Sequence, residues 1–487
     1  MSLKIIKLVG EQKRILFLPP INPVAIKGVA GSGKTTVALY RAKHLVETYQ
    51  DLFEESNIIV FTYNKSLAKY MEVILPYIPG GYQKDKDELL PTTTGLKIKI
   101  MNFHKWAYHF LTENKGLNLK TLDEGQIYEM VNRARKKYSS ANKIANKSPY
   151  FFINEISWIN GHLIKTEEEY MTIRRTGRGV TDRVTKLDRP IIWSIYQDYT
   201  QAKKNIGYVD FDDYALLCLM VLNEGDRKYS HIIIDEAQDL SKAELTVLGK
   251  LVRESTQSIS IIADAAQSIY KSGFSWSDVG MNIRGRSLQL SKNYRNTLEI
   301  AKAAYSLLDK EPEQSDFTPP TLSDERHGDK PIIAYFKDES QQNSYLCNII
   351  NNIRKAHSTD SIVVLNWNSR KLNELDKLLR TNNIPCKKIK DDDISDNNTY
   401  VNICTMSSIK GLEYDVVIIT GLNDEYPFLV GVDDDDKEEQ VSRQRRLLYV
   451  SMTRAKERLY LFSYGIPSFY LKEIDRNLVS VINDIPQ

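Results

Sequence analysis

The residues of this chain that are best suited to chemistry lie at positions 28–35, which have the spacing G-x-x-x-x-G-K-T. That is the spacing of a phosphate-binding loop. Glycines allow backbone conformations in which consecutive N–H groups point inward, and a helix that starts at the loop adds partial positive charge. Lys34 can reach the β- and γ-phosphates of a nucleotide, and the Thr35 hydroxyl can bind Mg²⁺. The pattern predicts a nucleotide site made of Gly28, Val29, Ala30, Gly31, Ser32, Gly33, Lys34 and Thr35, the alternative being an ordinary glycine-rich turn.

Two carboxylates directly follow a run of isoleucines that ends at residue 234. Such a run predicts a buried strand, and the C-terminal edge of an open α/β sheet is where ligands bind. Asp235 is placed to hold Mg²⁺ through its water shell, and Glu236 to orient or deprotonate an attacking water. An acidic loop after a strand is the simpler alternative, and the phosphate-binding loop argues against it.

Two glutamines suit the recognition of a nucleotide. Gln12 lies sixteen residues before Gly28, and its amide offers a donor and an acceptor together, which suits the edge of an adenine. Taken alone, Gln12 would be an ordinary surface residue. Gln267 follows a second expected strand, at whose tip its side chain can touch a γ-phosphate.

Several aromatic side chains at the ends of expected strands are candidates for stacking on nucleic-acid bases. Phe61 ends one strand, and Tyr270, Phe274 and Trp276 follow another. Packing in the core is the alternative for each of these rings. His104 is either a structural histidine or a contact to nucleic acid.

The composition indicates a globular protein with several domains. At 487 residues the chain has room for two to four domains, with 42% hydrophobic and 26% charged residues. No apolar run approaches the ~20 residues that span a bilayer, and the N-terminus lacks the pattern of a signal peptide. The four cysteines are far apart and form no C-x-x-C pair, which argues against a zinc ribbon, an iron–sulfur cluster or a disulfide framework and suits a reducing cytoplasm. We therefore expect a cytoplasmic protein with no membrane partner.

Strands and helices are expected to alternate along most of the chain, as is typical of an α/β fold with parallel sheets. Residues 106–205 interrupt this alternation with mainly helical patterns, and residues 309–330 read as a linker. Within the helical interval, residues 131–190 contain 13 Lys or Arg against 6 Asp or Glu. This basic stretch is either a phosphate-facing surface or a solvated helical face. The expected strands are residues 24–26, 57–62, 96–100, 231–234, 258–264, 331–335, 361–365, 401–405, 415–420 and 459–462.

With these pieces in order, the chain resembles the superfamily 1 helicases of the UvrD/Rep/PcrA group. The resemblance runs from Gln12 to about Leu461 and is weakest between residues 106 and 205. Six strings in the family's order carry it, and together they are far more specific than any one of them. They are residues 28–35, 235–239, 267–270, 293–295, 410–413 and 448–455, with weaker matches at residues 61–65, 103–104 and 210–213.

The resemblance implies two RecA-like P-loop domains that hold ATP and Mg²⁺ in the cleft between them. Arginines brought to the cleft would offset charge that hydrolysis moves onto the phosphate oxygens. The expected first domain is residues 1–105 and 206–300, the helical insertion is 106–205, and the second domain is 301–487. The resemblance implies adenine contacts for Gln12 and Tyr294, a ribose contact for Glu413, and γ-phosphate contacts for Gln267, Arg295 and Arg454. It makes these last three the expected catalytic residues together with Lys34, Asp235 and Glu236, and Thr35 and Asp235 the expected metal ligands. The implied nucleic-acid contacts are Phe61, Asn64, His104, Tyr270 and Trp276.

The sequence departs from the family pattern in places. Thr36, which we keep among the nucleotide contacts, stands where the family usually has arginine, and Ser407 stands where it has histidine. The loop after Tyr270 is longer than usual. Only about 115 residues separate Arg295 from Lys410, where the large helicases carry a bulky insertion. We therefore expect a short form, in which residues 386–400 bridge the gap and the second accessory subdomain is missing.

Two functions follow from this resemblance. The first is an ATP-dependent translocase or helicase on single-stranded DNA, for which the group implies a 3′ to 5′ direction. The alternative is a regulatory ATPase subunit of a larger complex, with a partner such as a defence nuclease or RNA polymerase, that does not unwind duplexes unaided. RNA in place of DNA stays open, because stacking and phosphate contacts accept either.

Overall fold

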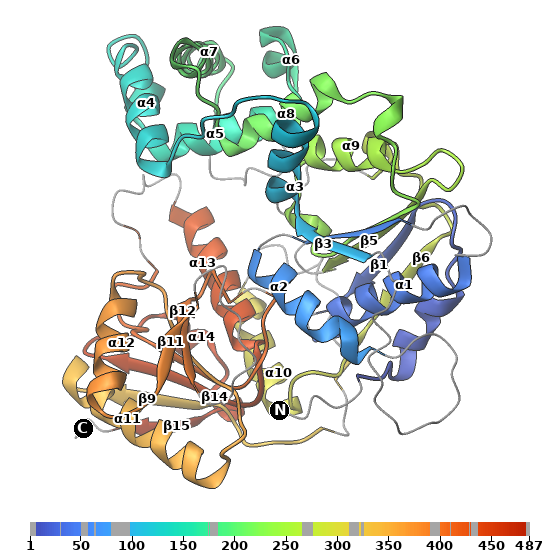
Figure 1. Cartoon of the computed structure of the whole chain (residues 1–487). Coiled ribbons are helices and arrows are strands. Elements are labelled where there is room, and N and C mark those ends of the chain that lie inside the picture. Colours follow the sequence, from blue (N-terminus) through green and yellow to red (C-terminus); the bar gives the residue numbers. More distant parts are fainter. Residues whose placement is uncertain are drawn as a thin grey trace.

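Two sheets of parallel strands form the framework of the protein, and helices cover both faces of each sheet (Figure 1). The expected α/β class with two parallel sheets is confirmed. The computed structural model describes residues 6–29, 31–49, 57–62, 65–78, 98–173, 175, 184–264, 276–310, 321–322, 326–389, 400–409, 411–427, 429 and 437–483.

The first sheet has the strand order β3-β2-β4-β5-β1-β6, and its pairings are parallel. Its central strands are buried on both faces, which explains why they read as continuous apolar runs in the sequence. Because the strands are parallel, the ends of β1, β4 and β5 open on the same edge. The strands are β1 (Val24–Gly28), β2 (Ile58–Thr62), β3 (Ile98–Asn102), β4 (His231–Ile234), β5 (Ser258–Asp264) and β6 (Ser287–Leu290).

The second sheet has the order β11-β12-β10-β13-β14-β9-β15 and is also parallel. Its two edge strands were not predicted, because β11 is only three residues long and mostly polar, and β15 lies beyond the last recognised motif. β11 pairs directly with β12, and residues 389–400 alone join them, which leaves no room for a folded subdomain. The strands are β9 (Ile332–Phe336), β10 (Ile362–Asn366), β11 (Cys386–Lys388), β12 (Val401–Thr405), β13 (Tyr414–Thr420), β14 (Ala455–Tyr464) and β15 (Ser480–Asn483).

Each sheet is covered by helices that bury one apolar stripe against it. Alternate side chains of a strand point to opposite faces, so Ile58 and Val60 of β2 pack under one set of helices and Ile59 under the other. On the first sheet, one face is covered by α1 (Lys34–Tyr49) and α2 (Lys65–Ile74). The other face is covered by α3 (Phe103–His109), α8 (Phe211–Val221) and α9 (Lys242–Leu251). On the second sheet, one face is covered by α11 (Glu339–Ala356) and α12 (Lys371–Thr381). The other face is covered by α10 (Leu298–Ser306), α13 (Lys437–Met452) and α14 (Tyr470–Glu473). No helix in the described ranges is both long enough and apolar enough to cross a membrane.

A helical insertion with its own core separates α3 from α8 (Figure 1). It contains α4 (Glu124–Lys136), α5 (Pro149–Gly161), α6 (Glu167–Thr172) and α7 (Arg189–Ile206). At its centre the carboxylate of Glu155 is fully buried, and the Arg175 guanidinium donates to both of its oxygens at 2.8 and 2.6 Å. The Tyr170 hydroxyl donates to the same carboxylate at 2.7 Å.

The chain passes from the first sheet to the second through residues 291–297, which we call the crossover segment. It begins after β6 and ends at Thr297, the residue that caps the N-terminus of α10. α10 packs against the second sheet, so the proposed boundary at residue 300 falls inside a helix of the second core. The bounds of the three domains otherwise stay a proposal.

Replacing Arg175 by methionine is expected to destabilise the helical insertion by about 3–5 kcal/mol, because the buried Glu155 carboxylate would lose a cation that donates to both of its oxygens. The matched control is Lys137→Met, whose more exposed ion pair with Asp198, 3.0 Å long, contributes ~1 kcal/mol or less. Urea unfolding followed by tryptophan fluorescence measures both, since two tryptophans lie in this core. Equal and small decreases in the free energy of unfolding of the two variants would contradict the proposed contribution of the buried ion pair.

Candidate active site

The loop between β1 and α1 holds the side chain of Lys34 inside itself. The ammonium group donates to the backbone oxygens of Gly28 and Val29, each at 3.1 Å, and forms an ion pair with Asp264 Oδ2 at 2.9 Å. Asp264 ends β5, the strand next to β1, with which it is in register at Gly28. The amine is therefore held at the mouth of the predicted phosphate site by neutralising contacts that a phosphate could replace.

Two glycines of this loop leave space that neighbouring side chains fill. Gly31 and Gly33 have φ angles of +77° and +80°, a region that favours glycine. A Cβ atom at Gly31 would lie 2.2 Å from Asn293 Oδ1, and one at Gly33 would lie 2.3 Å from Gln12 Nε2. Gln12 also donates to the backbone oxygen of Ser32 at 2.8 Å. The loop is thus clamped between two amide side chains, one of which was predicted to contact adenine.

The predicted acids meet the loop at the end of β4. The Thr35 hydroxyl donates to Asp235 Oδ2 at 2.9 Å. Burial raises the pKa of Asp235 to about 7, and the neighbouring charge of Glu236 adds to this, while Thr35 and Lys34 act the other way. The backbone of Glu236 has φ of +54°, a left-handed conformation that is costly for a residue with a Cβ. Strain at this point turns the chain so that two successive acids can serve one site.

The amide of Gln238 connects the acids of two strands. Its nitrogen donates to Glu236 Oε2, and its oxygen accepts from the backbone N–H of Asp264 at 3.0 Å. Neither Gln238 nor Asp264 was assigned a role from the sequence. The signal was present, because Asp264 ends an expected strand beside the phosphate-binding loop and Gln238 lies within the acidic motif.

The crossover segment contacts the loop from the other side. The Tyr294 N–H donates to the backbone oxygen of Gly31 at 2.9 Å, and its hydroxyl accepts from the Glu11 N–H at 3.3 Å. Arg295 forms an ion pair with Glu413, which precedes β13. Burial would raise the pKa of Glu413, but Arg295 and then Lys456 and Arg454 outweigh it, so the pKa lies below its ordinary value.

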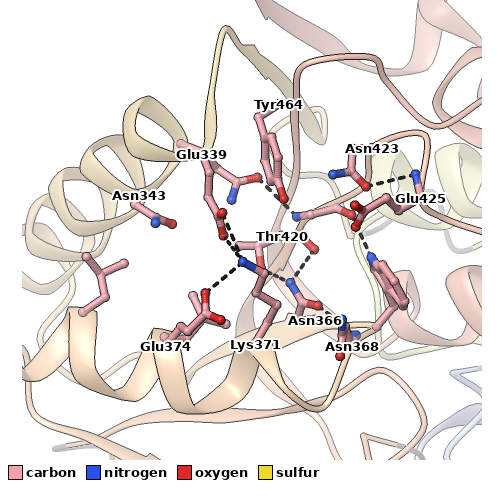
Figure 2. A pocket seen from close by; sticks show the side chains of 15 residues that line it. Glu339, Asn343, Asn366, Asn368, Lys371, Glu374, Thr420, Asn423, Glu425 and Tyr464 are labelled. Carbon is pink, nitrogen blue, oxygen red and sulfur yellow. Dashed lines mark hydrogen bonds and ion pairs between the residues drawn. The ribbon is translucent and has the colours of Figure 1, made fainter.

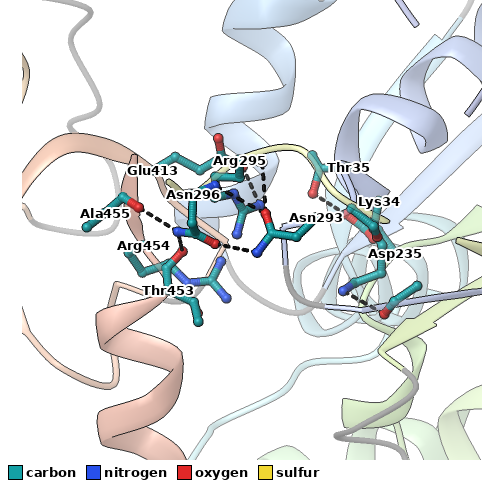
Figure 3. A network of polar contacts seen from close by, with 12 residues as sticks. Lys34, Thr35, Asp235, Asn293, Arg295, Asn296, Glu413, Thr453, Arg454 and Ala455 are labelled. Carbon is teal, nitrogen blue, oxygen red and sulfur yellow. Dashed lines mark hydrogen bonds and ion pairs between the residues drawn. The ribbon is translucent and has the colours of Figure 1, made fainter. Parts of the chain in front are cut away.

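Arg454 reaches the same place from the junction of α13 and β14 (Figure 3). Only 4% of this residue is exposed, and its Nε donates to the backbone oxygen of Val450 at 3.1 Å. Burial, and then the charge of Arg295, lower the pKa of the Arg454 guanidinium to about 10, while Glu236 and Asp264 act in the opposite direction. A cation of the second sheet therefore lies within electrostatic reach of the acids of the first.

The residues present fit a nucleoside triphosphate with Mg²⁺. Arg295 Nε and Ser32 Oγ are buried and have no hydrogen-bond partner within the described part of the chain. Oxygen ligands of the kind that Mg²⁺ prefers are offered by Thr35 and Asp235, which already touch. Thr36 lies half-buried in the first turn of α1. The glycine-rich loop therefore offers an anion hydrogen-bond donors and a backbone that carries no side chains at its glycines. Oxygen ligands for a bound metal ion lie next to this loop.

The expectation that Phe61 stacks on a base is wrong. Its ring has no exposed surface, and its centroid lies 5.9 Å from that of Trp106 in an edge-to-face contact. Phe61 faces the core because it continues the buried face of β2. Trp276 is half-buried and packs against the same core. The predicted contacts Ala30, Asn64, Gln267, Tyr270 and Phe274 lie outside the described residues.

His104 lies in a partly exposed group of rings between α3 and α8. Its ring centroid is 5.3 Å from that of Phe211, and its Nε2 is 3.8 Å from Glu244 Oε1. Phe211 is 53% exposed and the nearby Tyr108 43%. This aromatic surface, which we define as His104, Tyr108 and Phe211, was only partly predicted, since His104 alone was assigned a contact.

A hollow that is open to solvent lies at the C-terminal edge of the second sheet (Figure 2). The ammonium of Lys371 lies between Glu339 and Glu374, at 2.9 and 2.8 Å. The Asn366 amide donates to Thr420 Oγ1 at 3.1 Å. The walls of the hollow come from the ends of β10, β13 and β14 and from the starts of α11 and α12. They include Gln342, Asn343, Trp367, Asn368, Asn423, Glu425 and Tyr464. Sequence reasoning assigned no site here.

Two domains of a known protein family together match most of the chain. Residues 8–279 match the UvrD/REP helicase N-terminal domain, and residues 288–395 and 388–465 match the UvrD-like helicase C-terminal domain. The two C-terminal segments meet where β11 and β12 are joined by a short connection.

Curated relatives cover the chain at low identity. A probable DNA helicase II homolog of Mycoplasma pneumoniae is 23% identical over 74% of this chain and 51% of its own length. The ATP-dependent DNA helicase srs2 of Schizosaccharomyces pombe is 25% identical over 62% and 35%, respectively. The ATP-dependent DNA helicase PcrA of Leuconostoc citreum is 24% identical over 74% and 47%. The chain thus spans about half the length, or less, of these relatives.

The raised pKa of Asp235 predicts a pH dependence of stability. Because the folded state binds this proton more tightly than the unfolded chain, the contribution of the group is full at low pH and is lost as the pH rises toward 7. Between pH 5 and pH 8 the wild type is expected to lose stability relative to Asp235→Asn by a few kcal/mol, because each pH unit below the pKa of the folded state is worth about 1.4 kcal/mol. Urea unfolding of both proteins without Mg²⁺ or nucleotide measures this, and a difference that does not change with pH would contradict it.

Proposed function

We propose, from the premise that this chain belongs to the UvrD/REP helicase family, that it is an ATP-hydrolysing motor that moves on single-stranded DNA. The observation that carries the proposal is the meeting of two chemical groups at the junction of the sheets. The phosphate-binding loop and its acids come from the first sheet, and Arg454 comes from the second. A site divided in this way suits an enzyme that converts hydrolysis into relative movement of its domains.

The residues of the first sheet would hold the nucleotide and prepare the attacking water. The backbone of the loop and Lys34 would bind phosphates in place of the contacts to Gly28, Val29 and Asp264. Thr35 and Asp235 would hold Mg²⁺, which neutralises charge on the phosphate oxygens when bound. Glu236, held by Gln238, would orient the water and accept its proton.

The arginines would make hydrolysis depend on contact between the domains. Charge develops on the phosphate oxygens as the bond to the leaving group breaks, and guanidinium groups offset it best in a site that excludes water. Arg454 is almost completely buried at the junction. Any opening of the junction would withdraw Arg454 and slow hydrolysis, and this is the coupling that a motor needs.

The track for nucleic acid would run along the C-terminal edges of both sheets. On the first sheet the aromatic surface offers partly exposed aromatic residues, and stacking of bases on aromatic rings is tolerant of base sequence. On the second sheet the hollow of Figure 2 offers the Trp367 ring and several amides. Single-stranded DNA is our proposed substrate, with translocation from 3′ to 5′ by analogy with the group.

One observation favours a second candidate function, a regulatory ATPase within a larger complex. The direct pairing of β11 with β12 supports a motor without the accessory subdomain of the large helicases. A motor of this kind would track on DNA and depend on a partner subunit to separate strands.

Single-stranded DNA is expected to raise the rate of ATP hydrolysis, and Lys34→Ala or Glu236→Gln to lower the stimulated rate at least about 10²-fold, because each removes a group that acts on the phosphates or the water. The matched controls are Lys69→Ala and Glu72→Gln, an exposed pair on α2, which should keep the wild-type rate. A steady-state phosphate-release assay measures all five proteins. A wild-type rate that no DNA or RNA oligonucleotide changes would count against the motor.

Strand displacement on tailed duplexes of both polarities separates the two candidate functions. Unwinding of 3′-tailed substrates by the protein alone supports the helicase with the proposed direction. DNA-stimulated hydrolysis without displacement, together with a stoichiometric partner in native purification, supports the regulatory ATPase.

A further inference from the structure

One side chain of the crossover segment links the two domains directly. The amide nitrogen of Asn296 donates to the backbone oxygen of Thr453 at 2.9 Å and to that of Ala455. These two residues flank Arg454 on either side in the sequence. Asn296 is only 3% exposed, so its two N–H groups have little access to water. Loss of this amide would leave two carbonyl groups at the base of Arg454 without these donors.

The other end of the same amide leads back to the phosphate-binding loop. Asn296 Oδ1 accepts from Asn293 Nδ2 at 2.9 Å, and Asn293 Oδ1 accepts from the N–H groups of Arg295 and Asn296 at 2.9 and 3.1 Å. Asn293 fills the space left by the missing Cβ of Gly31. Figure 3 shows the hydrogen bonds from Asn293 through Asn296 to Thr453 and Ala455, on either side of Arg454.

We infer that Asn296 is a positioning residue for Arg454, which holds the backbone on both sides of the arginine at a fixed place relative to the phosphate-binding loop. The inference rests on the proposed function, because it gives Asn296 a role in hydrolysis. Asn296 acts through Arg454 and not on the nucleotide.

The length of the arginine side chain explains why such a support is needed. A guanidinium group stabilises developing charge only where it is placed in advance, and a displacement of 1 Å costs up to about 10²-fold in rate. The side chain itself has one described hydrogen bond, from Nε to Val450 in the preceding turn. That bond fixes Arg454 relative to α13, whereas Asn296 fixes the junction of α13 and β14 relative to the first domain.

A double-mutant cycle tests the inference. Asn296→Ala removes both donors, and Asn296→Ser, which keeps one hydroxyl donor, is a milder change should the alanine variant fold poorly. Asn160→Ala is the matched control, since Asn160 is equally buried but lies in the helical insertion, where its oxygen accepts from Tyr196. Each change is also made in an Arg454→Ala background. Steady-state hydrolysis of ATP with saturating single-stranded DNA gives kcat, and a fluorescent nucleotide gives the dissociation constant.

In the wild-type background Asn296→Ala should lower kcat about 10- to 100-fold, with the serine variant between it and the wild type. The nucleotide dissociation constant should change less than about threefold. In the Arg454→Ala background the same substitutions should change the rate less than about twofold, because the residue through which they act is gone. The control should keep the wild-type kcat.

Two results would overturn the inference alone. One is a wild-type kcat in both Asn296 variants, and the other is an equal loss with and without Arg454, which is what a general structural role would produce. A wild-type protein that hydrolyses no ATP, with or without DNA, would instead overturn the proposed function, and the inference with it.

Discussion

Opposite charges from the two sheets face each other across their junction, and their attraction restricts how the domains can meet. Arg295 is paired with Glu413, and Arg454 lies within reach of Glu236 and Asp264. Taking a charge out of water costs several kcal/mol unless a partner compensates it. A junction that slides would separate these pairs and leave buried charges without partners, so only arrangements that keep the pairs matched are favourable.

The same charges would favour the binding of a polyanion at this junction. Arg295 lowers the pKa of Arg454, which means that the two cations repel each other. On the opposite side burial raises the pKa of Asp235, and repulsion between Asp235 and Glu236 adds to this effect. Phosphates with Mg²⁺ would relieve both repulsions at once, by placing negative charge beside the arginines and a cation beside the acids. Lys34 would contribute in the same way, because its ion pair with Asp264 could be exchanged for one with a phosphate.

The sequence was informative where function restricts residue type closely. Eight positions of the phosphate-binding loop and the two acids after β4 could be recognised because anion binding and metal binding each allow few residues at that spacing. Asn296 could not be recognised, since a buried amide acquires its meaning from Thr453 and Ala455, more than 150 residues away. Phe61 was misjudged for a related reason: a strand end looks the same in sequence whether its ring faces solvent or the core.

The central claim is that the developing charge on the phosphate is stabilised by a residue of the second domain. The most direct measurement is the affinity for ADP with aluminium fluoride, a mimic of the transferring phosphoryl group, in the wild type and in Arg454→Ala. The variant is expected to bind ATP with nearly wild-type affinity but to bind the mimic at least about 10²-fold more weakly, since an arginine of this kind contributes mainly in the transition state. Equal affinities of both proteins for the mimic would contradict it.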